Sequence, residues 1–292
     1  MRTQSMDTHP EAERVLIELI RKASLKKRFG LARSLSNSAL YMHRRYIQER
    51  HSNTSKEEQA LIFITNVYGQ ALADGLRATL KKRQAYISDT PDLLTAMTPI
   101  TEAFEQLDIS YYIEGTVANS IYGMQRGTIN IDVVAGLHLE HVCPLLQQLE
   151  RSYYIDEETL RDAIQHRTSF NSIHLESMLK VDVLLPKDRP FDQQVRRRVQ
   201  QHVLAENTRP FCLASPEDVI LTQLERYRRA GDTADDQWNE ILGVLKVQGT
   251  ALDLTYLQQW ATTLAIADLL EEACSDAGFV DDDTHRREAT AA

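Results

Sequence analysis

The sequence predicts an α+β fold in which a mixed sheet core is flanked by an N-terminal helical module and a C-terminal helical bundle. Three observations support this class. Apolar residues recur at helical spacing near both ends of the chain. Residues 111–134 have the pattern of a strand, a tight turn, a short helix and a second strand. Residues 169–185 read as two strands of a hairpin, joined by the turn Glu176-Ser177-Met178.

Length and composition are those of an ordinary globular protein. Of the 292 residues, 42% are hydrophobic and 26% charged, which suffices for one large domain or two to three small ones. The longest apolar runs are far shorter than a membrane span, and the first residues lack the apolar core of a signal peptide. Three widely spaced cysteines, Cys143, Cys212 and Cys274, fit no metal-ligand pattern. We therefore expect a reduced, cytoplasmic protein that contacts no membrane.

The net charge of −9 argues against broad binding to polyanions, which depends on many lysine and arginine contacts to phosphate. Three basic runs could still form a local groove, at residues 81–83, 196–198 and 226–229. Charge runs usually lie on solvated helix faces, and we favour that interpretation for each of them. Contact with an RNA acceptor stays open.

Residues 1–88 are predicted to form the N-terminal helical module. Helices are expected over residues 12–27 and 29–50, and a third runs from the capping sequence Ser55-Lys56-Glu57-Glu58 to about residue 80. The module carries no residues that indicate chemistry. It is expected to pack against the rest of the chain, to bind a protein partner or to self-associate.

A candidate site lies in the segment Tyr111–Val134. A buried strand leads into a turn at Gly115 and Thr116, the turn opens a short helix, and a second strand follows. Because successive side chains on a strand alternate, Asn130 and Asp132 lie together on one face of that second strand. The N-terminus of a helix favours phosphate. Two oxygen-bearing side chains beside such a turn indicate a nucleotide site.

The same segment resembles the core motif of the nucleotidyltransferase superfamily, in the branch that includes the abortive-infection, AbiEii-like toxin nucleotidyltransferases. The residues that carry the resemblance are Gly115, Thr116, Ala118, Tyr122, Gly123, Arg126, Thr128, Asn130 and Asp132. Asn130 stands where the family has its first metal-binding aspartate. The resemblance covers roughly residues 91–273 and implies a polymerase-beta-like sheet core.

Asp182 matches the third acidic position of this family. It lies in the apolar strand 179–185, where Val181 and Val183 flank it. An edge-strand aspartate without a role is the alternative interpretation. A carboxylate with such apolar neighbours is costly without a cation or another partner, so we favour a functional role.

The resemblance assigns roles to these residues. The residues that would hold a divalent cation, Mg²⁺ or Mn²⁺, are Asn130, Asp132 and Asp182. The two aspartates would be the catalytic carboxylates, with Asp182 as the general base. A nucleoside triphosphate, the substrate, would be bound by Gly115, Thr116, Arg126 and Thr128. A structural ion pair is the alternative role for Arg126.

The C-terminal region departs from the family at positions that carry charge. The related proteins tend to have a lysine near Gln223 and an aspartate near Glu240. A neutral glutamine does not supply the positive charge of a lysine that faces phosphate. A helix is nevertheless expected to begin after Ser215-Pro216, because serine favours the N-cap and proline the first turn.

The chain is predicted to contain four regions. They are the helical module over residues 1–88, a nucleotidyltransferase-like α/β core over 89–205, a helical region over 206–280 and a disordered polar tail over 281–292. Further helices are expected at residues 93–107, capped by Thr90-Pro91, and at 138–152, 191–203, 233–247 and 254–273.

Two functions are compatible with this pattern. The first is metal-dependent transfer of a nucleoside monophosphate from a nucleoside triphosphate to a hydroxyl of RNA, protein or a small molecule. The second is a protein of the same fold that has lost catalysis and acts as a nucleotide-binding, regulatory or antitoxin-like partner module. An unrelated α/β domain is a weaker, third alternative. Asn130 is the residue that distinguishes the first two functions. With Asn in place of Asp, one anionic ligand is lost, and the attraction for a divalent ion falls by on the order of several kcal/mol before solvent offsets it.

Overall fold

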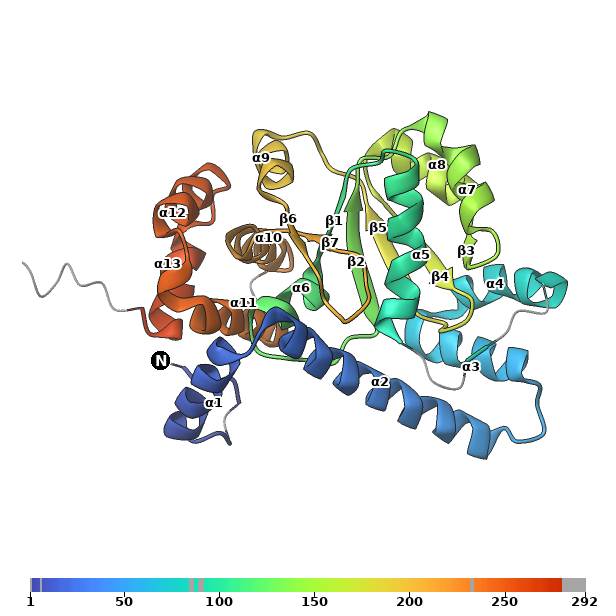
Figure 1. Cartoon of the computed structure of the whole chain (residues 1–292), viewed down its shortest axis with the longest axis horizontal. Coiled ribbons are helices and arrows are strands. Elements are labelled where there is room, and N and C mark those ends of the chain that lie inside the picture. The colour runs from blue at the N-terminus through green and yellow to red at the C-terminus, as the bar shows by residue number, and fades with distance from the viewer. Residues whose placement is uncertain (1, 6, 84–86, 89–91, 232–233, 280–292) are drawn as a thin grey trace, which may run out of the picture. The chain divides into compact units, whose positions relative to one another are not determined.

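The computed structural model describes residues 2–5, 7–83, 87–88, 92–231 and 234–279 (Figure 1). The chain forms two compact units. Unit one contains residues 1–28, 119–124 and 215–292, and unit two contains residues 29–118 and 125–214. The region boundaries predicted near residues 88, 205 and 280 stay a prediction, and the predicted tail lies outside the described residues. None of the helices in the described part of the chain has the length and apolar character that a membrane span requires.

Unit two is built on a mixed sheet. Within the described residues, seven strands pair in the order β3-β4-β5-β2-β1-β7-β6. The β1–β7 and β2–β5 pairs are parallel and the other pairs antiparallel. The predicted α+β class with a mixed sheet core is confirmed. The strands are β1 (Tyr111–Glu114), β2 (Asn130–Ala135), β3 (Tyr153–Ile155), β4 (Ser169–His174), β5 (Lys180–Leu184), β6 (Gln200–His202) and β7 (Phe211–Leu213).

Strands β2 and β5 lie in the middle of the sheet and show the alternation that the sequence predicts. Ile131 and Val133 are buried, as are Val181 and Val183, whereas the residues between them are half-buried. Strand β5 has β4 on one side and β2 on the other. Asp182 therefore does not lie on an edge strand, and the interpretation of it as an edge-strand aspartate is wrong.

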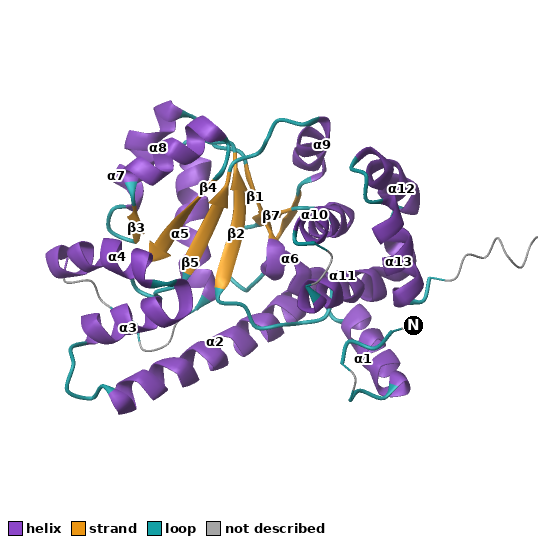
Figure 2. Ribbon diagram, turned by 180° about the vertical axis from the view of Figure 1, so that it is seen from behind, coloured by secondary structure: helices purple, strands orange, loops and turns teal. Residues whose placement is uncertain are grey.

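Helices cover the sheet of unit two. Helix α5 lies across one face of the sheet in Figure 1 and is seen behind the strands in Figure 2. Helices α2 and α6 contain positions at which the two units divide. The helices are α2 (Leu25–Arg50), α3 (Lys56–Tyr68), α4 (Gln70–Arg83), α5 (Leu93–Gln106), α6 (Gly115–Tyr122), α7 (Val142–Leu149), α8 (Glu157–His166) and α9 (Pro190–Arg198).

Several predicted helices of unit two have different limits in the structure. The helix expected from Ser55 to about residue 80 is broken by Gly69, whose φ of 98° is accessible to glycine and ends α3. The helix expected over 138–152 is a 3₁₀ turn, Leu139–His141, followed by α7. Asp92 caps α5, and the cap predicted at Thr90-Pro91 lies outside the described residues.

Unit one contains helices α1 (Pro10–Lys22), α10 (Pro216–Arg229), α11 (Asp235–Gln248), α12 (Leu254–Thr263) and α13 (Ala267–Ala277). Ser215 caps α10 as predicted, because its Oγ accepts a hydrogen bond from Asp218 N at 3.2 Å. The single helix expected over 254–273 is two helices, and Ala265, between them, has a φ of 57°. The predicted start of α11 at Thr233 lies outside the described residues.

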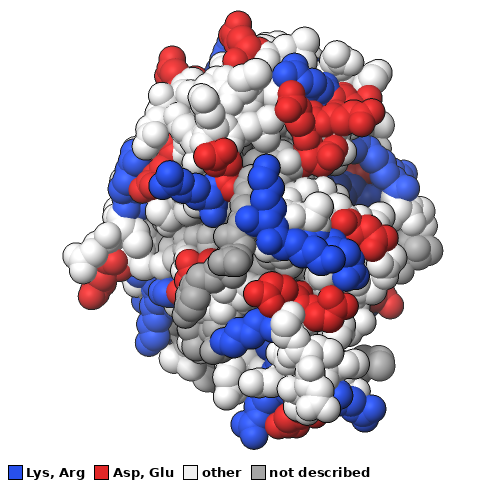
Figure 3. Space-filling model, turned by 90° about the vertical axis from the view of Figure 1, so that its right-hand side faces the viewer, with Lys and Arg blue, Asp and Glu red and all other residues white. Residues whose placement is uncertain are grey.

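The basic runs of the sequence include arginines that form ion pairs within their own unit. Arg196 lies 3.2 Å from Asp188 in unit two, and Arg229 lies 2.6 Å from Glu225 in unit one. On the face drawn in Figure 3, lysine and arginine side chains lie among aspartate and glutamate side chains. In the run 196–198, Arg197 is exposed while Arg196 and Arg198 are half-buried, so this run is only in part a solvated helix face.

Candidate active site

Strand register brings the acidic side chains of the candidate site together. Asp132 on β2 pairs directly with Asp182 on β5, and on its other side with Glu114 on β1. Directly paired residues place their side chains on the same face of a sheet. One row of carboxylates therefore crosses β1, β2 and β5, and all of it lies within unit two.

A second row lies on the same face, because alternate residues of a strand share a face. Asn130 on β2 pairs with Lys180 on β5. Both strands are parallel and in register over this stretch, so the amide and the ammonium group lie beside the two aspartates. Glu114 and Lys180 belong to the constellation although the sequence did not single them out. The signal for Glu114 was a carboxylate at the end of an apolar strand, directly before the glycine of the motif.

Gly115 is packed against Asp132. Its φ is +65°, and a Cβ atom at this position would lie 1.8 Å from Asp132 Oδ2. A side chain is therefore excluded both by backbone conformation and by the carboxylate. Gly115 begins helix α6, and Thr116 follows in its first turn. The structure thus places the predicted turn and the predicted aspartate in direct contact, at a helix N-terminus that favours negative charge.

Two buried oxygens in this cluster lack a hydrogen-bond partner among the residues that the structure describes. They are Asn130 Oδ1 and Asp182 Oδ1. Buried polar atoms are nearly always satisfied, so such atoms point to a missing water, ion or ligand. The other carboxylate oxygen of Asp182, Oδ2, lies 2.9 Å from Lys180 Nζ, and both side chains are 18% exposed.

Tyr68, the last residue of α3, positions this part of the cluster. Its hydroxyl donates to Ile129 O at 2.7 Å and accepts from Lys180 N at 3.3 Å. Lys180 Nζ lies 5.6 Å from the centre of the Tyr68 ring, within the range of a cation–π contact. Burial raises the pKa of the Tyr68 hydroxyl, so the group stays a hydrogen-bond donor. One tyrosine therefore ties β2, β5 and the lysine together.

The two remaining predicted residues lie where the chain enters β2. Thr128 is buried, and its backbone N–H donates to Ser36 Oγ at 2.8 Å. Its hydroxyl donates to Asn130 O at 2.8 Å and accepts from Asn130 N at 3.2 Å. Thr128 thus shapes the start of the strand that carries Asn130 and Asp132. Arg126 is half-buried in the loop before β2.

The donor atoms of the cluster fit a hard divalent cation in their chemistry. Among the residues that the structure describes, no three His, Cys, Asp or Glu side chains form a group that could hold a metal. Strand register places Asp132, Asp182 and Asn130 on one face of the sheet. Carboxylate and amide oxygens are ligands that Mg²⁺ and Ca²⁺ accept, and Asn130 Oδ1 and Asp182 Oδ1 have no hydrogen-bond partner among the described residues.

The two departures noted in the C-terminal region lie in unit one. Gln223 is buried, and its side-chain oxygen accepts a hydrogen bond from Gln237 Nε2 at 3.1 Å. Glu240 Oε2 accepts from Asn119 Nδ2 at 2.6 Å. Both side chains are thus held in local hydrogen bonds of this unit.

The sequence matches no protein-family model and no curated protein. Among solved structures, it is similar to ANT(2")-Ia in complex with adenylyl-2"-tobramycin, with 14% identity and a TM-score of 0.42 over 59% of this chain and 96% of the other. It is also similar to an antigenic nucleotidyltransferase-like protein from Paracoccidioides brasiliensis, with 15% identity and a TM-score of 0.38 over 59% and 91%. A solution structure of ANT(2'')-Ia is similar as well, with 12% identity and a TM-score of 0.39 over 61% of this chain and 96% of the other. These values are too low for the likeness to assign an activity.

Proposed function

We propose that this protein is a nucleotidyltransferase of the AbiEii-like branch and that the cluster around Asp132 and Asp182 is its nucleotide and metal site. The observation that supports this most directly is the register of β2 and β5, which sets the two aspartates opposite each other. Gly115, at the start of α6, lies against one of them. The proximity of Gly115, Asp132 and Asp182 within unit two supports the proposal.

The proposed reaction transfers a nucleoside monophosphate from a nucleoside triphosphate to a hydroxyl of RNA, protein or a small molecule. The acceptor oxygen attacks the α-phosphorus, and the bond from that phosphorus to pyrophosphate breaks. The hydroxyl proton passes to the carboxylate of Asp182, whose Oδ1 has no partner in the protein. Mg²⁺ or Mn²⁺, held by Asn130, Asp132 and Asp182, would neutralise charge on the phosphates.

The remaining residues of the cluster bind and position the nucleotide. The backbone at Gly115 and Thr116 presents N–H groups at a helix N-terminus, which suits a phosphate. Lys180 adds a positive charge beside Asn130, where the family has an aspartate. Relative to an all-aspartate cluster, the net charge of the site is therefore less negative. We infer that the site holds fewer divalent cations, or holds them more weakly, than the family motif does.

A second candidate function is nucleotide binding without turnover, in a regulatory or partner-binding module. Three observations favour it. Asn130 is neutral, and the Lys180 ammonium group already contacts Asp182 at 2.9 Å, where it competes with a metal ion for that carboxylate. Exposed apolar side chains on α2, including Met42 and Tyr46, suit a protein partner or self-association in the cytoplasm.

Calorimetric titration with each nucleoside triphosphate, with and without Mg²⁺ or Mn²⁺, tests the site. The wild type is expected to bind in a metal-dependent way, and the double variant Asp132→Ala, Asp182→Ala to lose binding. The double variant Glu158→Ala, Asp162→Ala removes the same charge from the exposed face of α8 and is expected to bind as the wild type does. Equal binding by all three proteins would place the nucleotide elsewhere.

Substitution of Asn130 by Asp separates the two functions. The restored carboxylate is expected to tighten Mn²⁺ binding by about tenfold or more, since one further unit charge faces the ion. Transfer of a labelled nucleotide that appears or rises in Asn130→Asp supports a scaffold competent for catalysis. Unchanged metal binding together with unchanged transfer would show that Asn130 is not a ligand.

A further inference from the structure

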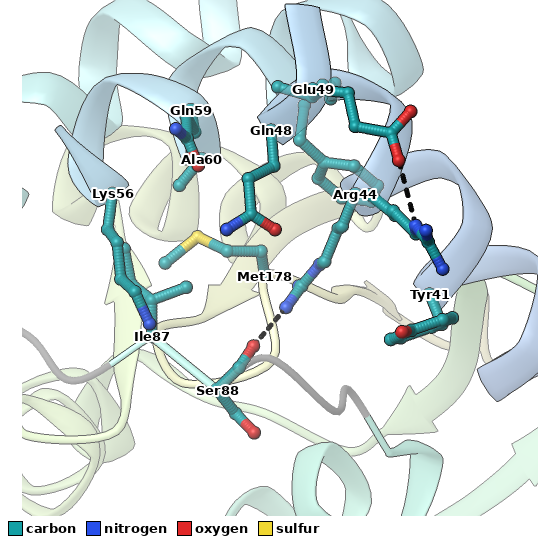
Figure 4. A pocket seen from close by; sticks show the side chains of 13 residues that line it. Tyr41, Arg44, Gln48, Glu49, Lys56, Gln59, Ala60, Ile87, Ser88 and Met178 are labelled. Carbon is teal, nitrogen blue, oxygen red and sulfur yellow. Dashed lines mark hydrogen bonds and ion pairs between the residues drawn. The ribbon is translucent and has the colours of Figure 1, made fainter. Parts of the chain in front are cut away.

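A cavity of about 280 Å³ lies in unit two, between helices α2 and α3, the segment Ile87–Ser88 and the turn before β5. Figure 4 shows Arg44 and Gln48 extending from α2, Lys56 from α3 and Met178 from the turn. None of these residues belongs to the site described above. The volume is close to the lower end of the range for small-molecule sites.

The floor of the cavity is apolar and belongs to the core of unit two. Its members are all at most 6% exposed: Ile47, Ala60, Phe63 and Met178. The Phe63 ring is also the edge-on neighbour of Tyr68, with ring centres 6.1 Å apart. The floor is therefore closed, and the accessible aromatic side chain of the lining is Tyr41, which is 49% exposed and suits a flat or aromatic group.

The rim of the cavity is cationic. Three of its residues carry a positive charge, Arg44, Arg45 and Lys56, and Glu49 carries a negative one. The lining residues that the structure describes therefore carry a net charge of +2, from three positive charges minus one, in a chain whose net charge is −9. Such a local reversal of charge raises the local concentration of anions.

The cations differ in how they are held. Arg44 donates to the carbonyl oxygens of Ser88 and Ser177 and lies 5.2 Å from the centre of the Phe63 ring. Arg45 pairs with Glu49 at 2.9 Å, and both side chains are about two-thirds exposed, 64% and 65%. An exposed pair of this kind contributes little to stability, so an incoming anion can replace Glu49 at little cost.

We propose that this cavity binds a small organic anion with an aromatic body, whose ring lies against Tyr41 and whose acidic group meets Arg45 and Lys56. The amide of Gln48, which also lines the cavity, supplies a polar contact. The site is independent of the proposed nucleotidyl transfer, since it shares no residue with the cluster around Asp132.

A matched pair of fluorescent probes tests the chemistry on the full chain. 8-Anilinonaphthalene-1-sulfonate carries the aromatic body and the anionic group, and N-phenyl-1-naphthylamine carries the same rings without the sulfonate. The sulfonate is expected to bind with one site per chain and at least tenfold more tightly than the neutral amine. Equal affinities would show an apolar surface without anion recognition and would overturn the proposal.

Two charge-reversed variants test the location. Arg45→Glu with Lys56→Glu is expected to weaken sulfonate binding by at least tenfold. Lys81→Glu with Lys82→Glu makes the same change in net charge on the exposed face of α4 and is expected to leave binding unchanged. Equal losses in both variants would mean that net charge alone governs binding, and no loss in the first would place the probe elsewhere. Circular dichroism checks that each variant is folded.

Methyl NMR of ¹³C-methionine gives a second measurement that depends on no surface variant. The Met178 methyl signal, assigned through Met178→Leu, is expected to shift on addition of the sulfonate. The signal of Met97, buried in α5 and outside the cavity, is expected to stay in place. A shift of Met97 without Met178, or of neither signal, would overturn the proposal.

Discussion

Two lysine–carboxylate pairs, one in each unit, differ in how completely they are satisfied. In unit one, Lys246 Nζ lies 2.7 Å from Glu13 Oε1, and each side chain is 1% exposed. The same ammonium group donates to Arg2 O, and Glu13 Oε2 accepts from Gln4 N at 3.0 Å. The ammonium group and both carboxylate oxygens of this buried pair therefore have hydrogen-bond partners.

The pair in unit two is left incomplete. Lys180 Nζ lies 2.9 Å from Asp182 Oδ2, both side chains keep 18% of their surface exposed, and Asp182 Oδ1 has no hydrogen-bond partner in the described part of the chain. Asn130 Oδ1, beside it, has none either. The comparison teaches that a buried ion pair which holds a fold together closes on itself, whereas one at a site keeps oxygens that only a further group can satisfy.

Removal of the lysine from the closed pair is expected to have the largest effect. Lys246→Met leaves Glu13 as an uncompensated charge at 1% exposure, and such losses cost about 3–5 kcal/mol of unfolding free energy. Urea denaturation followed by circular dichroism measures the change. The double variant Lys246→Met, Glu13→Leu removes both charges and is expected to recover most of the loss. A single variant as stable as the wild type would show that the pair is not structural.

The contact between Gly115 and Asp132 is expected to give the next largest effect. Gly115→Ala adds a Cβ 1.8 Å from a carboxylate oxygen at a φ of +65°, so we expect a loss of about 1–3 kcal/mol and of nucleotide binding. Gly30→Ala is the control, because nothing lies within 4 Å of a Cβ there and alanine favours the α2 helix. Gly30→Ala is expected to be neutral or stabilising. If Gly115→Ala still bound nucleotide, the turn at Gly115 would not be part of the nucleotide site.

Much of the sheet and of the site followed from local patterns in the sequence. The alternation of Ile131 and Val133 with polar residues identified β2, and the same rule identified β5. Serine before proline located the cap at Ser215. Asp132 and Asp182 were selected because they match acidic positions of the motif that the sequence resembles, and Asp182 also because its neighbours in the strand are apolar. These signals are readable because each depends on residues close in the chain.

The rest depends on pairing between distant segments. Glu114 and Lys180 join the cluster only through the register of β1 with β2 and of β2 with β5, which the sequence pattern does not state. Short polar strands such as β6, Gln200–His202, carry no alternation to detect. In α2 the helical spacing was recognised, but Leu31 and Leu35 are exposed while Leu40 is buried. The periodicity predicted where this helix lies in the sequence but not which of its faces is buried.

Lys180→Met is expected to have the smallest effect on stability. It is also the most direct test of the difference between the two ion pairs. The pair is less buried than Lys246–Glu13, so loss of the lysine is expected to cost less than Lys246→Met does, about 1 kcal/mol of unfolding free energy. Asp182 then has no competing cation, and Mn²⁺ binding without nucleotide is expected to tighten by about three- to tenfold, since two unit charges near 4 Å interact by about 1–4 kcal/mol near a protein surface.

Electron paramagnetic resonance of Mn²⁺ measures that affinity directly and needs no knowledge of the acceptor. Binding of nucleoside triphosphate to the same variant is expected to weaken, because a positive charge that faces phosphate is lost. Opposite changes in metal and nucleotide affinity mark Lys180 as a fixed cation of the site. A large loss of stability with unchanged metal affinity would instead make the Lys180–Asp182 pair a second structural pair like Lys246–Glu13, and the contrast between the two units would fail.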